Sequence, residues 1–123
     1  MRVFVTRQFA RFASGERLSD AVLREAVRRA DDGLIDANLG GGVIKQRIAR
    51  AGGGKSGGYR TIIVFRRGSL AIFLYGFAKN DRENIGPKEL KEYRWAASWM
   101  LNQSEAELDA AVAKMVLREI TDD

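Results

Sequence analysis

The segment "VIKQRIARAGGGKSGGYRTIIVFRRGSLAIFLYGFA" (residues 43–78) holds three strand patterns separated by two turn signals. Residues 43–49 alternate between two sets of side chains, as expected for a strand with one buried face. Residues 59–66 and 70–78 are richer in β-branched and aromatic side chains, which is typical of central strands. The tetrapeptide "RRGS" predicts a tight turn between these two, and the glycine-rich residues 50–58 predict a wide hairpin before them. The segment therefore predicts an antiparallel sheet.

The first strand of this segment separates its side chains by charge. Ile44, Gln46 and Ile48 share one face, whereas Lys45 and Arg47 share the other and lie about 7 Å apart. We expect helices to cover the face of Ile44 and Ile48. The opposite face is then a concave surface rimmed by four cations: Lys45, Arg47, Arg60 and Lys79.

Apolar periodicity predicts one more strand and four helices around this segment. The strand opens the chain, and residues 31–42 read as a connecting loop. The helices are expected at residues 6–13, 19–30, 88–101 and 104–123. In the second helix the apolar stripe is Val22, Ala26, Val27 and Ala30. The fourth opens with the capping box "SEAE", and its stripe is Leu108, Val112, Met115 and Val116.

The order of elements predicts one domain over residues 1–123, of the α+β class. An antiparallel sheet would carry a helical pair near the N-terminus and helices after the last strand. Residues 104–123 would form a C-terminal helical extension of this domain.

Charge is distributed unevenly along the chain. Residues 37–80 contain eight basic residues and no acidic one, whereas residues 81–123 contain ten acidic and six basic residues. Lysines and arginines on a sheet edge also deter aggregation, but such edges usually mix both signs of charge. A long run without a carboxylate favours a polyanion as the partner.

The composition excludes several classes of site. The chain has no cysteine and no histidine, which removes disulfides, cysteine nucleophiles, histidine zinc sites and the Ser-His-Asp triad. No run approaches the roughly 18 apolar residues of a membrane span, and the start lacks the apolar core of a signal peptide. We therefore expect a cytoplasmic protein.

The triplet Gly54-Lys55-Ser56 does not form a P-loop. That motif requires a glycine at position 49, where this chain has Ala49, and a helix after the loop. A strand pattern follows the loop instead. The glycines are better explained as the tip of a hairpin.

The segment and the residues after it resemble the RelE/ParE superfamily of type II toxins, and within it the HigB-like RelE branch. The shared features are the K-x-R strand of Lys45 and Arg47, the glycine-rich hairpin, and "GGYR" at the start of the next strand. A hydrophobic hairpin follows, and then "KNDRENI" ahead of a helix. The resemblance covers about residues 2–101.

This resemblance implies a RelE-like fold and a ribosome-dependent mRNA endonuclease that inhibits translation as the toxin of a type II toxin–antitoxin system. Members of the family use no metal or other cofactor, because the 2′-OH of the RNA is the nucleophile. The implied partners are mRNA on the ribosome, ribosomal RNA and a cognate antitoxin of the helix-turn-helix type.

The resemblance also implies roles for individual cations. Lys45 and Arg47 match the paired cations of the family's strand, and Arg60 matches its phosphate-contacting arginine. Lys79 lies near its last basic site, for which Arg82 is the other candidate. Such groups stabilise a phosphorane by charge-assisted contacts, and a lysine among cations can act as a base if its pKa is lowered. Three further cations are expected to contact RNA phosphates: Arg50, Lys55 and Arg82.

One departure from the family leaves the general base unassigned. Many relatives carry a tyrosine just past the last basic site, where this chain reads "RENIG". Tyr59 or Tyr75 could substitute, although each reads as a core or sheet residue.

Two other functions remain open. A gyrase poison of the ParE type would share the fold, and a non-catalytic RNA-binding module would use the same cations to grip phosphate. The sequence shows no cluster of aromatic residues on the expected binding face, which argues against stacking on single strands as the main binding mode.

Overall fold

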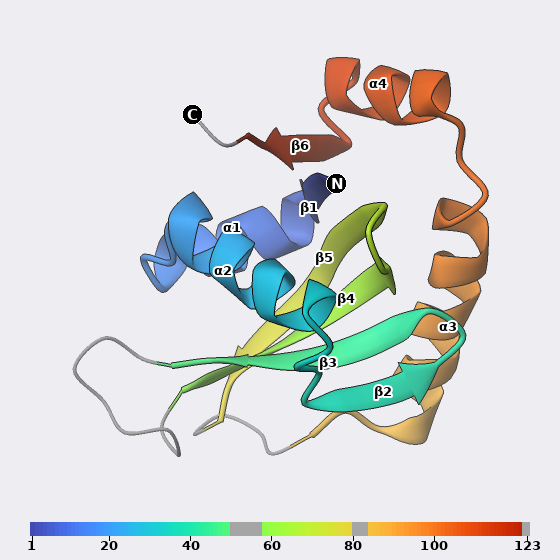
Figure 1. Ribbon diagram of the computed structural model, residues 1–123. Helices are drawn as coiled ribbons and strands as arrows, with labels where there is room; N and C mark the ends of the chain where they lie inside the picture. Colours follow the sequence, from blue (N-terminus) through green and yellow to red (C-terminus); the bar gives the residue numbers. More distant parts are fainter. Residues whose placement is uncertain (50–57, 80–83, 122–123) are drawn as a thin grey trace.

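The computed structural model of the chain describes residues 1–49, 58–79 and 84–121. A single sheet runs through the molecule and has helices on both faces (Figure 1). The elements in chain order are β1 (Arg2–Thr6), α1 (Arg7–Gly15), α2 (Asp20–Asp31), β2 (Ala37–Gly40), β3 (Val43–Ile48), β4 (Tyr59–Arg66), β5 (Leu70–Ala78), α3 (Pro87–Met100), α4 (Glu105–Ala113) and β6 (Leu117–Ile120).

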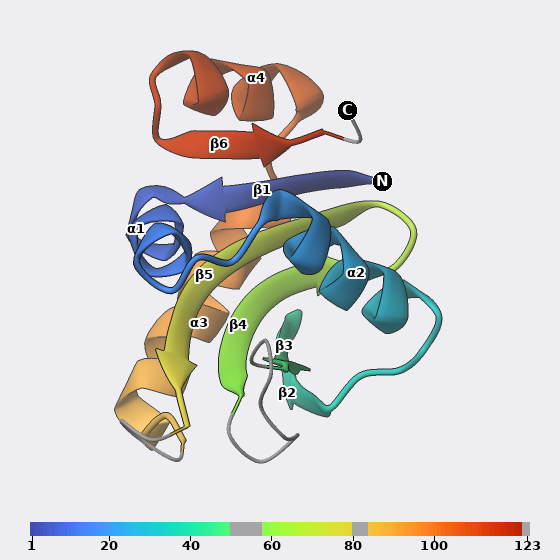
Figure 2. The ribbon, with the colours of Figure 1, turned by 90° about the vertical axis from the view of Figure 1, so that its left-hand side faces the viewer.

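The sheet has the strand order β2-β3-β4-β5-β1-β6, and β3, β4 and β5 form its curved centre (Figure 2). All neighbouring strands are antiparallel except β1 and β5, which are parallel. This pair is parallel because α1 and α2 carry the chain across the sheet before the β2-to-β5 meander returns beside β1. The predicted α+β class is confirmed, and the sheet is mostly antiparallel.

Each face of the sheet has its own hydrophobic core. Ile44, Ile48 and Ile63 pack with α1 and α2, and Val43 and Ile62 pack with α3 and α4. The prediction that helices cover the face of Ile44 and Ile48 is therefore confirmed. Lys45 and Arg47 alternate with these residues and lie on the α3 side.

Helix α2 differs slightly from its prediction. Ala26, Val27 and Ala30 are buried as expected, but Val22 is exposed and Leu23 is buried in its place. The apolar stripe is thus rotated by about one residue at the start of the helix, whose N-cap is Ser19.

Strand β2 lies within residues 31–42, for which the sequence pattern predicts a loop. It pairs antiparallel with β3, and the intervening Gly41 and Gly42 have φ values of 64° and 83°. Two consecutive residues with positive φ form the tight turn that suits a two-residue hairpin, and glycine takes this conformation without strain.

The predicted C-terminal helix is wrong beyond Ala113. Met115 has a φ of 61°, and the N–H groups of Met115 and Val116 donate to the carbonyls of Val112 and Ala111. These two bonds form a Schellman cap that ends α4. The chain then turns into β6, so Met115 and Val116 are exposed and do not continue the apolar stripe.

Candidate nucleic-acid interface

The cations of β3 and β4 point to the α3 side of the sheet, at neighbouring positions of the strand register. Arg47 of β3 is directly opposite Arg60 of β4, and Arg60 is opposite Phe77 of β5. Lys45 lies one row away, opposite Ile62, whose side chain packs in the core on the α3 side. Side chains in register on neighbouring strands share a face. We call the four residues Lys45, Arg47, Arg60 and Lys79 the cationic face.

Arg60 lies deeper than the rim position expected from the sequence. It is only 8% exposed, and its Nη1 donates one long hydrogen bond of 3.5 Å to the carbonyl of Tyr59. No carboxylate of a described residue forms an ion pair with it. A charge that is mostly removed from water is costly unless an opposite charge compensates it, so this guanidinium is suited to receive an anion.

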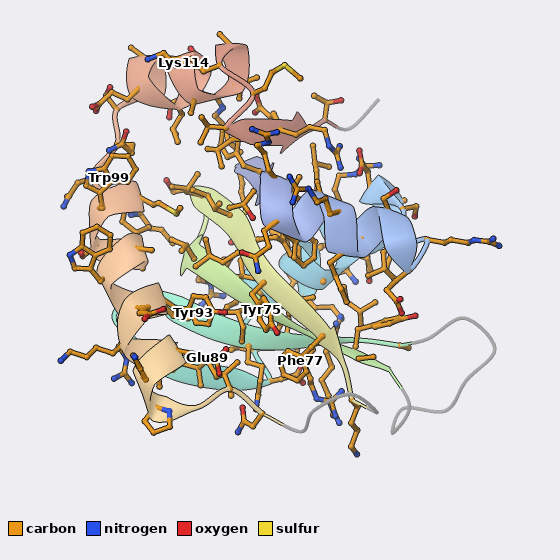
Figure 3. All side chains as sticks on the ribbon, turned by 180° about the vertical axis from the view of Figure 1, so that it is seen from behind. Tyr75, Phe77, Glu89, Tyr93, Trp99 and Lys114 are labelled. Atoms are coloured by element: carbon orange, nitrogen blue, oxygen red, sulfur yellow. The ribbon has the colours of Figure 1, made fainter. Side chains whose placement is uncertain are left out.

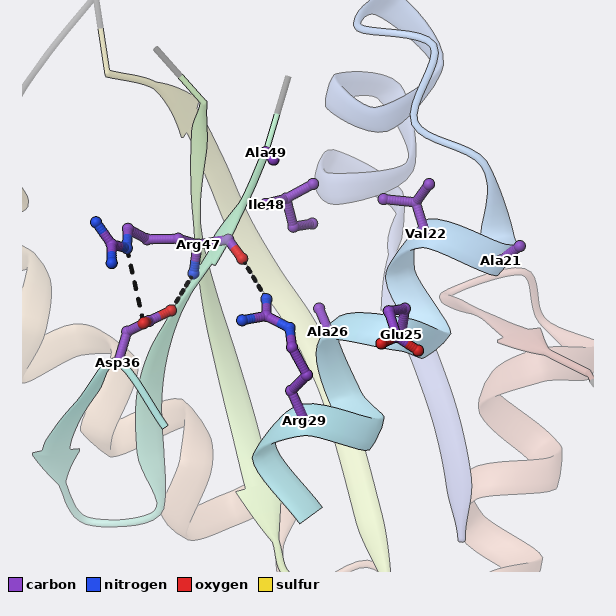
Figure 4. Close-up of a pocket in the computed structure, with 9 residues that line it drawn as sticks. All are labelled: Ala21, Val22, Glu25, Ala26, Arg29, Asp36, Arg47, Ile48 and Ala49. Carbon is purple, nitrogen blue, oxygen red and sulfur yellow. Dashed lines mark hydrogen bonds and ion pairs between the residues drawn. The ribbon is translucent and has the colours of Figure 1, made fainter. Parts of the chain in front are cut away.

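Arg47 is held in place from two sides (Figure 4). Asp36 accepts a hydrogen bond of 2.6 Å from the backbone N–H of Arg47, and its other carboxylate oxygen lies 3.6 Å from Nε of the guanidinium. The carbonyl of Arg47 accepts a bond of 2.6 Å from Arg29 of α2. Asp36 could not be predicted as a partner of Arg47 from the sequence, because only the β2–β3 hairpin brings the two residues together.

The two lysines occupy the margins of the cationic face. Nζ of Lys45 lies 3.5 Å from Oδ1 of Asn84, at the limit of a hydrogen bond. Lys79 directly follows β5, and its backbone N–H donates to Gly58. The structure thus brings Lys45, Arg47 and Arg60 to one side of the sheet, and Lys79 lies beside the start of β4, just past the end of β5. The other predicted RNA contacts, Arg50, Lys55 and Arg82, lie outside the described residues.

Aromatic residues gather beside these cations, contrary to the sequence analysis. Tyr75 stacks on Tyr93 of α3 with 6.0 Å between ring centroids, and Phe77 lies 5.8 Å from Tyr75. Figure 3 shows the three side chains in the space between β5 and α3. Tyr59 belongs to the opposite core, where it meets Phe12 edge to face. Of the two tyrosines considered from the sequence, Tyr75 alone lies on the side of the cationic face.

A sizeable cleft lies elsewhere in the described part of the chain. It has a volume of about 530 Å³ between α2 and β3, and its walls are mainly small and apolar, including Val22, Ala26 and Ile48 (Figure 4). Arg47 contributes to its edge while its guanidinium points toward Asp36. The cationic face therefore lies on the other side of β3 from this cleft.

The described residues show no grouping of three acidic, histidine or cysteine side chains that could hold a metal ion. Within the same part of the chain, every helix is too short or too polar to cross a membrane.

Comparison with known families gives one clear result. Residues 1–120 match the model of the family described as the RelE toxin of the RelE/RelB toxin–antitoxin system. Among curated proteins, none matches the chain. The match extends through β6 and thus beyond the region covered by the resemblance seen in the sequence, while the HigB-like branch stays a prediction. The chain belongs to the RelE toxin family and is the toxin of a toxin–antitoxin system.

Proposed function

We propose that this toxin is a metal-independent endoribonuclease that cuts mRNA on the ribosome. The observation that carries the proposal is the buried residue Arg60, whose guanidinium has no carboxylate partner among the described residues and which lies directly opposite Arg47. A phosphodiester oxygen placed between these two side chains would supply the missing negative charge.

The reaction that suits this face is attack of the 2′-oxygen on the neighbouring phosphorus. The 2′-OH gives up its proton to a water molecule while the bond from 2′-oxygen to phosphorus forms. The bond from phosphorus to 5′-oxygen breaks, and the products carry a 2′,3′-cyclic phosphate and a 5′-OH. Arg60 and Arg47 would stabilise the doubly charged phosphorane, since fixed cations help most where charge develops. Lys45 or Lys79, as an ammonium group, would protonate the departing 5′-oxygen.

The shape of the face supports dependence on the ribosome. Lys45, Arg47 and Arg60 lie on adjacent strands of a sheet, and the cleft between α2 and β3 lies on the other face of β3. A sheet surface alone does not hold a flexible RNA strand in line for attack, and such alignment provides much of the rate of a displacement reaction. The decoding site would present the codon already ordered.

A non-catalytic RNA-binding function is the second candidate. The stacked pair of Tyr75 and Tyr93 favours it, because aromatic rings beside cations are a common platform for unpaired bases. The two functions differ in their product. A binding module leaves the RNA intact, whereas the proposed enzyme leaves two new ends.

Expression of the toxin alone tests the proposal. Growth should stop, and primer extension on mRNA from the induced cells should find new 5′ ends inside translated frames. An mRNA whose start codon is mutated should stay intact in the same cells, because it does not enter the decoding site. Intact messages together with continued protein synthesis would refute the proposal.

A further inference from the structure

Helix α3 carries two tryptophans on the C-terminal half of its outer face. Trp95 and Trp99 are 73% and 61% exposed, whereas Ala97, on the opposite side of the helix, is completely buried. They are separated by four residues and therefore form a continuous ridge, which Lys91 extends by one further turn. Figure 3 shows Trp99 pointing away from the sheet. We call Lys88, Lys91, Trp95 and Trp99 the tryptophan ridge.

The fold does not use this ridge. The inner side of α3 supplies the packing, through Tyr93, Ala97 and Leu101. Within the described chain, neither indole N–H has an acceptor, and neither Lys88 nor Lys91 has an ion-pair partner. Two large apolar side chains side by side in solvent are typical of an interaction surface.

We propose that the tryptophan ridge is the docking site for an amphipathic, acidic helix of the antitoxin. The family supplies a protein partner, since the chain is the toxin of a toxin–antitoxin system. Exposed tryptophans are the side chains that most often dominate binding energy at protein interfaces. A partner helix with apolar side chains at its centre and carboxylates around them would cover the rings, accept from the indole N–H groups and pair with both lysines.

The chemistry of the ridge favours a protein over RNA. Its two lysines are accompanied by one carboxylate, Glu92, three residues before Trp95, so its net charge is small. Polyanion binding needs several cations in a row, and those cations lie on the sheet on the inner side of α3. An antitoxin helix on the ridge would leave the cationic face itself uncovered.

The fluorescence of the toxin reports directly on this surface, because the chain has two tryptophans and both lie on the ridge. The full-length toxin is produced with 5-fluorotryptophan, so that its rings are distinguished from any in the partner. Its ¹⁹F spectrum and its quenching by acrylamide are measured alone and with the cognate antitoxin, identified as the protein whose co-expression restores growth. We expect both resonances to shift and quenching to fall several-fold on saturation with the antitoxin.

Other occupants give different results. Shielding by 70S ribosomes or by anionic vesicles, but not by the antitoxin, would overturn the proposal. So would shielding that grows with toxin concentration alone, since that indicates a second copy of the chain. An antitoxin that binds while both tryptophans stay exposed would overturn it as well.

Matched variants add a test that does not depend on the fluorescence. Replacing both tryptophans by serine should weaken antitoxin binding by about 30-fold or more, with unchanged thermal unfolding because the side chains are exposed. Lys91→Glu should weaken binding several-fold, and the neighbouring Glu92→Lys should strengthen it. If Lys91→Glu and Glu92→Lys change the affinity in the same direction, the partner is not acidic at this point. This outcome stays separate from the proposed mRNA cleavage, because it is read from binding.

Discussion

Gln46 and Arg60 are two buried polar side chains on neighbouring strands, and they differ in how completely the fold satisfies them. The amide nitrogen of Gln46 donates to the carbonyls of Ala26 and Leu34, both at 3.1 Å, and its oxygen accepts from Asp36 N at 2.8 Å. Arg60 makes one long bond to its neighbour's carbonyl. The two lie on opposite faces, since Gln46 is in line with Ile44 and Arg60 is opposite Arg47.

This difference separates a structural polar group from a candidate functional one. Gln46 ties α2 and the segment after it to β3, and the fold uses both N–H donors of its amide. Arg60 has five N–H donors and uses one of them within the described residues. On the α2 side of the sheet the hydrogen bonds of the buried Gln46 are satisfied within the fold. On the α3 side the buried Arg60 has a positive charge without a carboxylate partner among the described residues.

Replacement of Gln46 by leucine should remove its hydrogen bonds and destabilise the fold. The change keeps the volume but removes the side-chain partners of the Leu34 carbonyl and the Asp36 N–H, which should lower the free energy of unfolding by about 2–4 kcal/mol. Urea unfolding followed by circular dichroism measures this loss. Gln8→Leu, on the exposed surface of α1, is the control and should have little effect. An equally small effect at position 46 would mean that its hydrogen bonds do not stabilise the fold.

Arg2 differs from Arg60 because the fold compensates its charge with carboxylates. Its guanidinium meets Glu119 with bonds of 2.8 and 2.9 Å, and Glu105 and Asp109 at 2.7 and 2.8 Å. The hydrogen bonds from Arg2 hold the pKa of Glu119 below its usual value. A carboxylate with a lowered folded-state pKa stabilises the protein above its unfolded pKa, and this contribution is lost as the pH falls through the folded value.

Arg2→Met should therefore destabilise the chain in a pH-dependent way. We expect a loss of about 1 kcal/mol at pH 7, given the partial exposure of the network. The difference from the parent should shrink as the pH falls through the acidic range where Glu119 becomes protonated. Thermal unfolding of both proteins from pH 7 to pH 3 measures it. A difference that is constant over this range would contradict the assigned role of the carboxylates.

Replacement of Arg28 by alanine should have the smallest effect on stability and toxicity. Arg28 pairs with Glu25 and with Asp32 at 2.8 Å on the exposed surface of α2. Solvent screens such pairs, so Arg28→Ala should leave the melting temperature and the toxicity unchanged. A growth assay beside a thermal melt checks both. Loss of toxicity in a stable Arg28→Ala protein would place a functional surface on α2, outside the cationic face.

The centre of the sheet could be predicted from the sequence, but its edges could not. Strand patterns at residues 59–66 and 70–78 coincide with β4 and β5, because long apolar runs bounded by turn residues have few alternatives. Strand β2 was missed because its four residues "ANLG" lack β-branched side chains. The glycine pair that follows was the signal for a hairpin turn.

The end of α4 gave no comparable signal. Helices often stop at a glycine in the left-handed conformation, but here Met115 takes that position. The apolar stripe runs on through Met115 and Val116, so periodicity alone extends the helix too far.

The sequence predicted which cations form the candidate site, but not which residues contact them. Alternation alone puts Lys45 and Arg47 on one face. The pairing of Arg47 with Arg60, the hydrogen bond from Asp36 and the nearby Tyr93 all depend on strand register and helix packing. These are contacts between distant parts of the chain, which local patterns do not specify.

The most direct test of the account measures activity and stability together in Arg60→Met. Methionine keeps an apolar side chain that reaches about as far as Nε of the arginine and removes the charge. We expect cleavage of ribosome-bound mRNA by the purified protein to fall by about 10²–10³-fold. The melting temperature should stay the same or rise, because an uncompensated buried charge is removed. Arg11→Met, on the exposed surface of α1, is the control and should retain full activity. Cleavage within about threefold of the parent rate, or a loss of activity that accompanies unfolding, would contradict the claim that Arg60 is kept for the scissile phosphate.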